Sequence, residues 1–250
     1  LNSSSGLANS SSRGPAHDGR IKPDIGAKGT SVYSTVAGND YDTYTGTSMA
    51  APGISGVLGQ LYQAYKELNS QINPQSGLMK GILLNSADDI GNSGPDFKHG
   101  WGEVNALRAV QILENQHYYE GNVSHAGTNT HTISIPSGTE QVKVMVYWHD
   151  KEASVSANIA LINNLDITLI APNGTSYNPW VLDHTPNSTN LNQPATRGVD
   201  DRNNVEQVTL DNPTSGNYTL TVNGTSVPYG PQTYYVVYDI ISEGIKLTYP

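Results

Sequence analysis

The sequence predicts two domains of different class, an α/β domain over residues 1–118 and an all-β domain over residues 119–250. Two observations support this division. Gly-rich loops alternate with long helical patterns in the first half. In the second half, short runs rich in Val, Ile, Thr and Tyr are separated by turn sequences, with no helical pattern between them. The chain of 250 residues is long enough for two ordinary domains.

The composition narrows the class of protein. Hydrophobic residues make up 36% and charged residues 14% of the chain, which contains no Cys and has a net charge of −9. Disulfides and thiolate metal sites are therefore excluded. The acidic balance argues against nucleic-acid binding, which needs clustered Lys and Arg. No apolar run reaches the roughly 18 residues that a membrane span needs, and the polar, acidic profile favours a secreted protein.

Three helices are expected in the first half: residues 47–68, residues 76–85, and a third that starts near Asn105. Thr47 is the expected N-cap of the first helix, and Pro52 lies early enough in it to cost little hydrogen bonding.

The first helix contains Gly53, Gly56 and Gly59, each of which costs about 1 kcal/mol relative to Ala. A surface helix gains nothing for this cost, whereas a buried helix gains close approach to its neighbours. The three glycines therefore predict a buried, central helix.

Five runs in the second half read as strands, and Gly-, Pro- and Asn-rich turns separate them. They are residues 141–149, 165–170, 205–210, 217–222 and 233–240. Several strands without intervening helices predict a β-sandwich or jelly roll. Tyr234, Tyr235 and Tyr238 are expected to pack within a strand rather than to form a sugar-binding surface.

Ser48, in the stretch "GTSMAAP", follows the expected start of the first helix. Unpaired backbone N–H groups and the positive end of the helix dipole meet at such a position. An oxyanion that forms there is stabilised, which suits a nucleophilic serine. From position alone, the alternative is that Ser48 only caps the helix.

Three motifs bear on this choice: "SSSRGPAHDGRIKPDIGAKG" (10–29), "GTSMAAPGISGV" (46–57) and "GWGEVNALRAV" (100–110). In this order they resemble the C-terminal part of the catalytic domain of the subtilisin-like serine proteases (subtilases). The resemblance implies a parallel sheet with helices, and it implies that Ser48 is the nucleophile of a peptide-cleaving acyl-enzyme mechanism. It also places Thr47 in support of the oxyanion region. A departure is Lys28, where the family usually has Pro.

The Asp, His and oxyanion Asn motifs of that family lie N-terminal to everything in this sequence. None of the seven histidines has the family's His context; they are His17, His99, His117, His125, His131, His149 and His184. A serine without a positioned base stays protonated and loses most of its reactivity. We therefore expect the chain alone to be inactive, as a C-terminal fragment of a serine endopeptidase.

The second half is similar to the jelly-roll domain that follows the catalytic domain in some bacterial alkaline subtilases, on the segments 144–150, 162–175, 200–208 and 215–237. This resemblance implies structural calcium. Ca²⁺ prefers carboxylate, amide and carbonyl oxygens. Candidate ligands are Asp166, which follows Asn163 and Asn164, and a cluster made of Asp200, Asp201, Asn203, Asn204 and Glu206. From these, the expected ligands are Asp166, Asp201, Asn204 and Glu206. The alternative is that these Asp and Asn runs form turns and solvated loops.

The partners expected are a protein or peptide substrate and the N-terminal remainder of the same peptidase domain, in the same chain or as a separate, nicked one. An open parallel sheet edge would also favour dimerisation. A different class of function stays open: a secreted, non-catalytic binding or adhesion module with a remnant peptidase scaffold.

Overall fold

A computed structural model of the chain describes residues 1–2 and 6–242. The chain forms two compact units. Unit 1 consists of Leu1–Asn115 together with Leu182–Ala195, and unit 2 of the remaining residues from Gln116 onward. The predicted boundary at residues 118/119 lies close to the end of the first segment. The assignment of Leu182–Ala195 to unit 1 was not anticipated from the sequence.

Unit 1 contains three α-helices, as predicted. They are α1 (Thr47–Leu68), α2 (Ser76–Asn85) and α3 (Ala106–Glu114). The N-cap of α3 is Asn105, whose Oδ1 accepts a hydrogen bond of 3.0 Å from the backbone N–H of Arg108. The N-cap of α1 is Gly46 rather than Thr47. A short 3₁₀ helix, Asn190–Asn192, completes the helical content.

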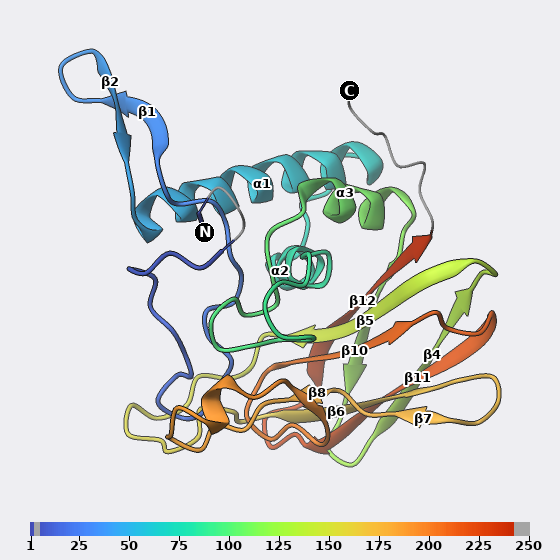
Figure 1. The fold of residues 1–250 in the computed structure, drawn as a ribbon. Coiled ribbons are helices and arrows are strands. Elements are labelled where there is room, and N and C mark those ends of the chain that lie inside the picture. Colours follow the sequence, from blue (N-terminus) through green and yellow to red (C-terminus); the bar gives the residue numbers. More distant parts are fainter. Residues whose placement is uncertain (3–5, 243–250) are drawn as a thin grey trace. The chain divides into compact units, whose positions relative to one another are not determined.

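The strands of unit 1 differ from the expectation. β1 (Val32–Val36) and β2 (Asp40–Tyr44) pair antiparallel as a ribbon that extends away from the helices of the unit (Figure 1). In the described part of the unit, parallel pairing is limited to an isolated bridge between Gly26 and Glu103. The expected parallel sheet is absent from these residues because they contain no strand–helix–strand unit. The helical part of the α/β expectation is present.

The prediction that α1 is a buried helix is wrong for the described chain. Leu61 is the only buried residue of its 22. By contrast, α2 buries eight of its 10 residues. The physical reason is a lack of packing partners: a Cβ added at Gly53, Gly56 or Gly59 would meet no described atom within 4 Å.

Unit 2 is built from two antiparallel four-stranded sheets. The first has the order β10-β5-β12-β3, with β10 (Val205–Asp211), β5 (Thr139–Trp148), β12 (Gln232–Ser242) and β3 (Tyr118–Val123). The second has the order β4-β11-β6-β7, with β4 (Thr128–Ile135), β11 (Gly216–Ser226), β6 (Asn164–Ile170) and β7 (Ser176–Tyr177). A further small pair joins β8 (Trp180–Val181) to β9 (Thr196–Arg197). All five predicted strands are present.

One hydrophobic core lies within unit 2 and draws side chains from both sheets. Along β6, buried and partly exposed residues alternate, because successive side chains of a strand point to opposite faces. Trp148 is fully buried, and its indole N–H donates a hydrogen bond of 2.9 Å to the carbonyl of Asn163. Tyr234, Tyr235 and Tyr238 are buried, as predicted for strand packing.

Candidate active site

Ser48 is the second residue of α1, directly after the turn that joins β2 to the helix. The backbone N–H of Gly46 donates a hydrogen bond of 2.8 Å to the carbonyl of Gly29, which anchors the helix start. A Cβ at Gly29 would lie 2.6 Å from the carbonyl oxygen of Gly46. Glycine at position 29 therefore permits the close approach that holds Ser48 in place.

The electrostatic environment at the N-terminus of α1 favours a negative charge. The first N–H groups of a helix have no carbonyl partner within the helix, and no acidic residue lies in the first turn of α1. The side chain of Ser48 is exposed, and no hydrogen bond joins its Oγ to any of the described residues. An accessible hydroxyl at the positive end of a 22-residue helix results.

A pocket of about 470 Å³ lies beside the start of α1. Its walls come from loop residues such as Leu7 and Ser10, from the strand-like segment around Ile25, and from Thr47 and Ala51 of the helix. Ser48 is not one of the lining residues. The structure thus brings Thr47, but not Ser48, to the wall of this pocket.

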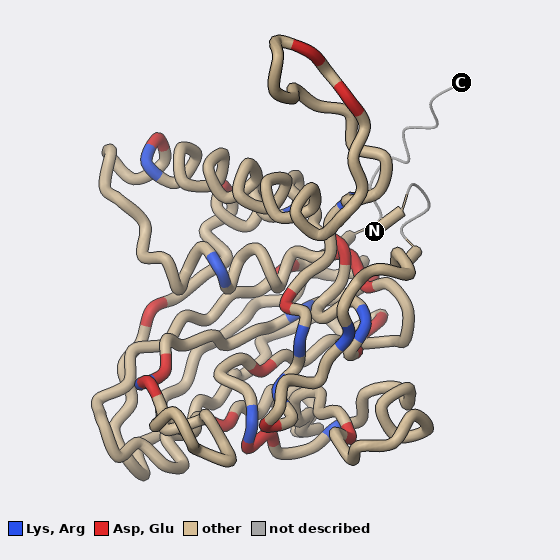
Figure 2. Tube along the Cα trace, turned by 90° about the vertical axis from the view of Figure 1, so that its left-hand side faces the viewer, with Lys and Arg blue, Asp and Glu red and all other residues tan. Residues whose placement is uncertain are grey.

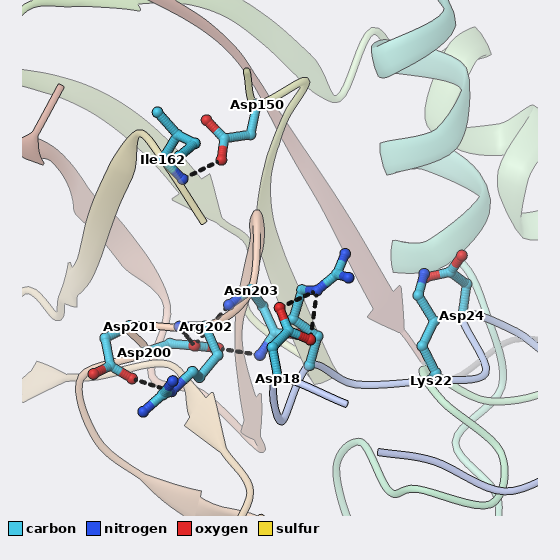
Figure 3. A network of polar contacts seen from close by, with 10 residues as sticks. Asp18, Lys22, Asp24, Asp150, Ile162, Asp200, Asp201, Arg202 and Asn203 are labelled. Atoms are coloured by element: carbon cyan, nitrogen blue, oxygen red, sulfur yellow. Dashed lines mark hydrogen bonds and ion pairs between the residues drawn. The ribbon is translucent and has the colours of Figure 1, made fainter. Parts of the chain in front are cut away.

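A second, mostly apolar cavity of about 340 Å³ lies between α1 and α2, lined by residues such as Leu58 and Met79. Asp24 lies at its edge, with Lys22 Nζ at 2.6 Å (Figure 3) and Lys80 Nζ at 3.3 Å. Burial raises the pKa of Asp24, but hydrogen bonds and charge from the two lysines outweigh burial and lower it. The carboxylate of Asp24 is therefore held at the edge of this cavity by its ion pairs with Lys22 and Lys80.

The histidines of unit 1 have other surroundings. His99 is buried, and its Nδ1 lies 3.2 Å from Oδ2 of Asp96. The carboxylate of Asp96 also accepts the backbone N–H groups of Lys98 and His99, at 2.8 and 2.7 Å. These hydrogen bonds join His99 to the loop that precedes it, and they do not involve Ser48.

The four residues expected to bind calcium lie in different environments of unit 2. Glu206 is fully buried, and its Oε2 accepts the backbone N–H of Ile167 at 2.8 Å. Asp166, on β6, accepts a hydrogen bond from the hydroxyl of Thr225. Asn204 donates its side-chain N–H to the carbonyl of Trp148 at 2.6 Å. Asp201 is exposed and pairs with Arg202 at 3.1 Å (Figure 3).

Asp200 belonged to the candidate cluster in the sequence, but its neighbour Asp201 was the expected ligand. Asp200 is only 4% exposed, and its Oδ1 accepts the backbone N–H groups of Arg202 and Asn203 at 2.8 and 3.0 Å. Such an arrangement is typical of an Asp at the start of a turn. The pattern "DDRNN" contained this signal, but either Asp suited it.

No described helix is long and apolar enough to cross a membrane. Nor do three His, Asp or Glu side chains in residues 1–2 and 6–242 stand together in a metal-binding arrangement.

Comparison with known proteins finds sequence similarity over most of the first segment of unit 1. Residues 1–102 match the sequence model of the subtilase family. The serine protease/ABC transporter B family protein tagA of Dictyostelium discoideum is 23% identical over 90% of this chain, which spans 15% of that protein. The C5a peptidase of Streptococcus pyogenes is 41% identical over 32% of the chain, which spans 7% of it.

Among solved structures, a lanthipeptide protease overlaps 30% of this chain and 22% of its own, with 33% identity and a TM-score of 0.28. That score is too low to support a shared overall fold. The assignment depends on the sequence matches, which agree with the motifs around Ser48 and Gly100. This chain is therefore subtilase-like over residues 1–102.

Proposed function

We propose that this chain is the nucleophile-bearing part of a serine endopeptidase, in which Ser48 Oγ attacks the carbonyl carbon of a peptide bond. The observation that carries the proposal is the position of Ser48. It is exposed at the start of a long helix, within the residues that match the subtilase family.

In the proposed reaction, Ser48 Oγ forms an ester with the acyl part of the substrate and the amine leaves; water then hydrolyses the ester. The negative charge on the substrate oxygen is stabilised by the backbone N–H of Ser48 and by the positive end of the α1 dipole. Thr47, which lines the adjacent pocket, supports this oxyanion region.

A complete site needs a base that takes the Ser48 proton, and we propose that the base is supplied from outside residues 1–250. Ser48 Oγ has no hydrogen-bond partner among the described residues. The chain by itself is therefore expected to be inactive, and its partner is the N-terminal remainder of the same peptidase domain, whether in one polypeptide or as an associated chain.

The uncovered surface of α1 supports this partner. The helix carries no charged residue from Thr47 to Tyr65, and its charges, Lys66 and Glu67, lie at the C-terminal end (Figure 2). An exposed helix usually has charged residues along its solvent side. Uncharged small residues, with three glycines among them, suit a helix that another backbone layer covers closely.

We assign to unit 2 a jelly-roll architecture, which the eight strands of its two four-stranded sheets support. The polar, acidic composition supports action outside the cell. The competing function, a non-catalytic binding module, gives no role to an exposed serine at the start of α1.

The nucleophile is tested in the longer protein that contains this segment, using an active-site-directed phosphonate and a peptide substrate. Ser48→Ala should abolish phosphonate labelling and lower kcat/KM by at least about 10³-fold. Ser55→Ala is the matched control: it removes an exposed serine of the same helix, whose Oγ donates to the carbonyl of Ala51 at 3.2 Å. It should leave labelling and kcat/KM unchanged.

The dependence on a partner is tested with residues 1–250 alone, where the phosphonate should leave Ser48 unlabelled. Stoichiometric labelling of Ser48 in this chain would overturn the proposed external base. Full activity of the Ser48→Ala variant of the longer protein would overturn the nucleophile role of Ser48. A longer protein that shows neither phosphonate labelling nor peptidase activity would favour the binding-module alternative.

A further inference from the structure

The segment of residues 151–161 joins β5 of the first sheet of unit 2 to β6 of the second. All of its residues are described, and none of them lies in a helix or strand. Val155, at its middle, is fully exposed, and Ile159 is 39% exposed. A backbone hydrogen bond of 3.0 Å, from the N–H of Ala157 to the carbonyl of Ser154, forms a turn there. The segment is therefore an accessible loop and not part of the core.

The two ends of this loop are held together by one carboxylate. Oδ1 of Asp150, directly before the loop, accepts the backbone N–H of Asn163 at 2.8 Å, and its Oδ2 accepts that of Ile162 at 2.6 Å (Figure 3). Trp148 adds a third link, because its indole N–H donates to the carbonyl of Asn163 at 2.9 Å. A break within the loop would leave these three hydrogen bonds in place.

The strands before and after the loop alternate within the sheets. β3, β4 and β5 precede the loop, and in the described sheets no two of them are hydrogen-bonded neighbours. β5 lies between β10 and β12, β3 pairs with β12, and β4 pairs with β11. All of these partners follow the loop in sequence. The strands of unit 2 that precede the loop therefore have all their described partners after it.

The hydrophobic core has the same division. Val144, Val146 and Trp148 come from before the loop, Leu165 and Leu220 come from after it, and all five are fully buried. Separation of the two parts would expose these side chains to water, which is strongly unfavourable. The loop itself buries little surface, so a cut there removes almost none of the packing. The two parts are therefore expected to stay together after a cut.

We propose that residues 153–160 are a processing site, at which an endopeptidase that prefers small aliphatic residues cuts unit 2 into two chains that stay folded together. In the cut, water adds across one peptide bond: the C–N bond breaks, a C–O bond forms, and the new ends are a carboxylate and an amine. Exposed loop tips with small or polar residues are the preferred sites of such cleavage. The sequence "ASVSANIA" meets this condition and contains no Pro to prevent an extended conformation. The inference does not depend on the proposed protease activity.

A second exposed segment, Leu182–Ala195, is less suited to cleavage. Oδ1 of Asp183 accepts the backbone N–H of Thr185 at 2.9 Å, and Asn190–Asn192 forms a 3₁₀ helix. An endopeptidase that binds its substrate in an extended conformation must first undo these turns. We therefore expect the first cut in residues 153–160.

The test treats residues 1–250 with a limiting amount of pancreatic elastase, which cuts after small aliphatic residues, and locates the first cut by mass spectrometry. We expect that cut within residues 153–160, with two fragments whose masses sum to that of the chain plus one water. The cut chain should elute as one particle from a size-exclusion column and keep its circular dichroism. Its Tm should depend on protein concentration, whereas the Tm of the uncut chain should not. Urea should separate the fragments, and its removal should restore the particle only when both are present.

Asp150→Ala removes the carboxylate that spans the cut, so it should weaken reassociation of the two fragments by at least about tenfold. The matched control is Asp183→Ala, which removes an exposed carboxylate whose partner, Thr185, lies on the same fragment, and it should leave reassociation unchanged. A chain in which two glycines replace residues 153–160 should be cut by elastase at least about tenfold more slowly than the wild type. Where this shortened chain does not fold, the position of the first cut in the wild type decides.

Two results would overturn the proposal. One is a first elastase cut outside residues 153–160 while this loop stays intact, which would show that the loop is not the accessible site. The other is a cut chain that dissociates or loses its circular dichroism in the absence of urea. That result would mean that the uncut loop, rather than strand pairing and the shared core, holds the two parts together.

Discussion

Units 1 and 2 differ in how completely they bury their own apolar surface. In unit 2, both sheets contribute to one core, and large side chains such as Trp148 and Tyr234 are fully buried. In unit 1, α2 is almost wholly buried, whereas the longer α1 buries Leu61 alone. Unit 2 therefore has the properties of a self-sufficient domain. Unit 1 leaves most of its longest helix, α1, exposed, and this helix carries the candidate nucleophile Ser48.

The largest effect on stability is expected from a substitution in the core of unit 2. Trp148→Ala should lower the free energy of unfolding of this unit by about 3–5 kcal/mol, because it removes a fully buried aromatic side chain and leaves a cavity. Trp148→Phe should cost less, since it keeps most of the ring and loses only the hydrogen bond to Asn163. Urea unfolding followed by circular dichroism measures both.

The control is Val155→Ala, at a residue that is fully exposed, and it should change stability by less than about 0.5 kcal/mol. Equal effects of Trp148→Ala and Val155→Ala would show that unit 2 has no such core, and the contrast between the units would fail.

The next largest effect is expected in α1, whose exposed glycines distinguish unit 1 from unit 2. In residues 1–250, the triple change of Gly53, Gly56 and Gly59 to Ala should stabilise unit 1 by about 2–3 kcal/mol. Each new Cβ meets no described atom within 4 Å, and each glycine costs about 1 kcal/mol in a helix. In the longer protein, where we propose that α1 is covered, the same change should lower activity or stability because the Cβ atoms clash. Thermal unfolding of both forms measures the reversal of sign.

Gly100→Ala is the matched control for this reversal. Gly100 has φ of 65°, and a Cβ there would lie 2.1 Å from the carbonyl oxygen of Pro23, so the change should destabilise both forms. Loss of stability from the triple change in residues 1–250 alone would mean that α1 is already packed in solution, for example against a second copy.

Much of the fold was predictable because it depends on local chemistry. The bounds of α1 and α2 follow from residue periodicity and from the polar or Gly-rich segments around them. The missed strands carry weaker signals: β4 reads "TNTHTISI" and β3 "YYEGNV", where polar residues interrupt the apolar pattern. Their pairing with β11 and β12 is non-local, so no short window of sequence reveals it.

In the candidate site, too, local features were predictable from the sequence and packing was not. Ser48 could be placed from its motif, because a helix N-terminus is a local feature. The burial of α1 was mispredicted because the prediction took its three glycines as a packing surface, and no described residue packs closely against them. Asp200 and Asp201 were indistinguishable in sequence, because the turn alone determines which of the two side chains is buried.

The smallest expected effect concerns pH and belongs to unit 2. His131, on β4, lies with its Nε2 2.8 Å from the hydroxyl of Tyr234 and stacks on Tyr119 at 5.3 Å. Burial lowers its pKa below 6.5, so the folded state favours the neutral ring. The unfolded chain then binds more protons just below that value. The contribution of His131 to stability is complete above pH 6.5 and is lost as the pH falls below it.

Two results therefore distinguish this effect from the titration of other groups. The urea midpoint of unit 2 should be lower at pH 5.5 than at pH 7.5, and His131→Gln should reduce the difference because Gln does not titrate. His117 stacks on Tyr238 at 4.5 Å, and burial lowers its pKa as well, against the opposing charge of Asp239. His117→Gln should therefore reduce the difference too. Two outcomes would contradict this prediction: a urea midpoint of the wild type that rises on acidification, or a drop in the midpoint that both variants retain in full. Either would show that these aromatic stacks tolerate a charged imidazole ring, and that the edge of unit 2 is packed less tightly than its core.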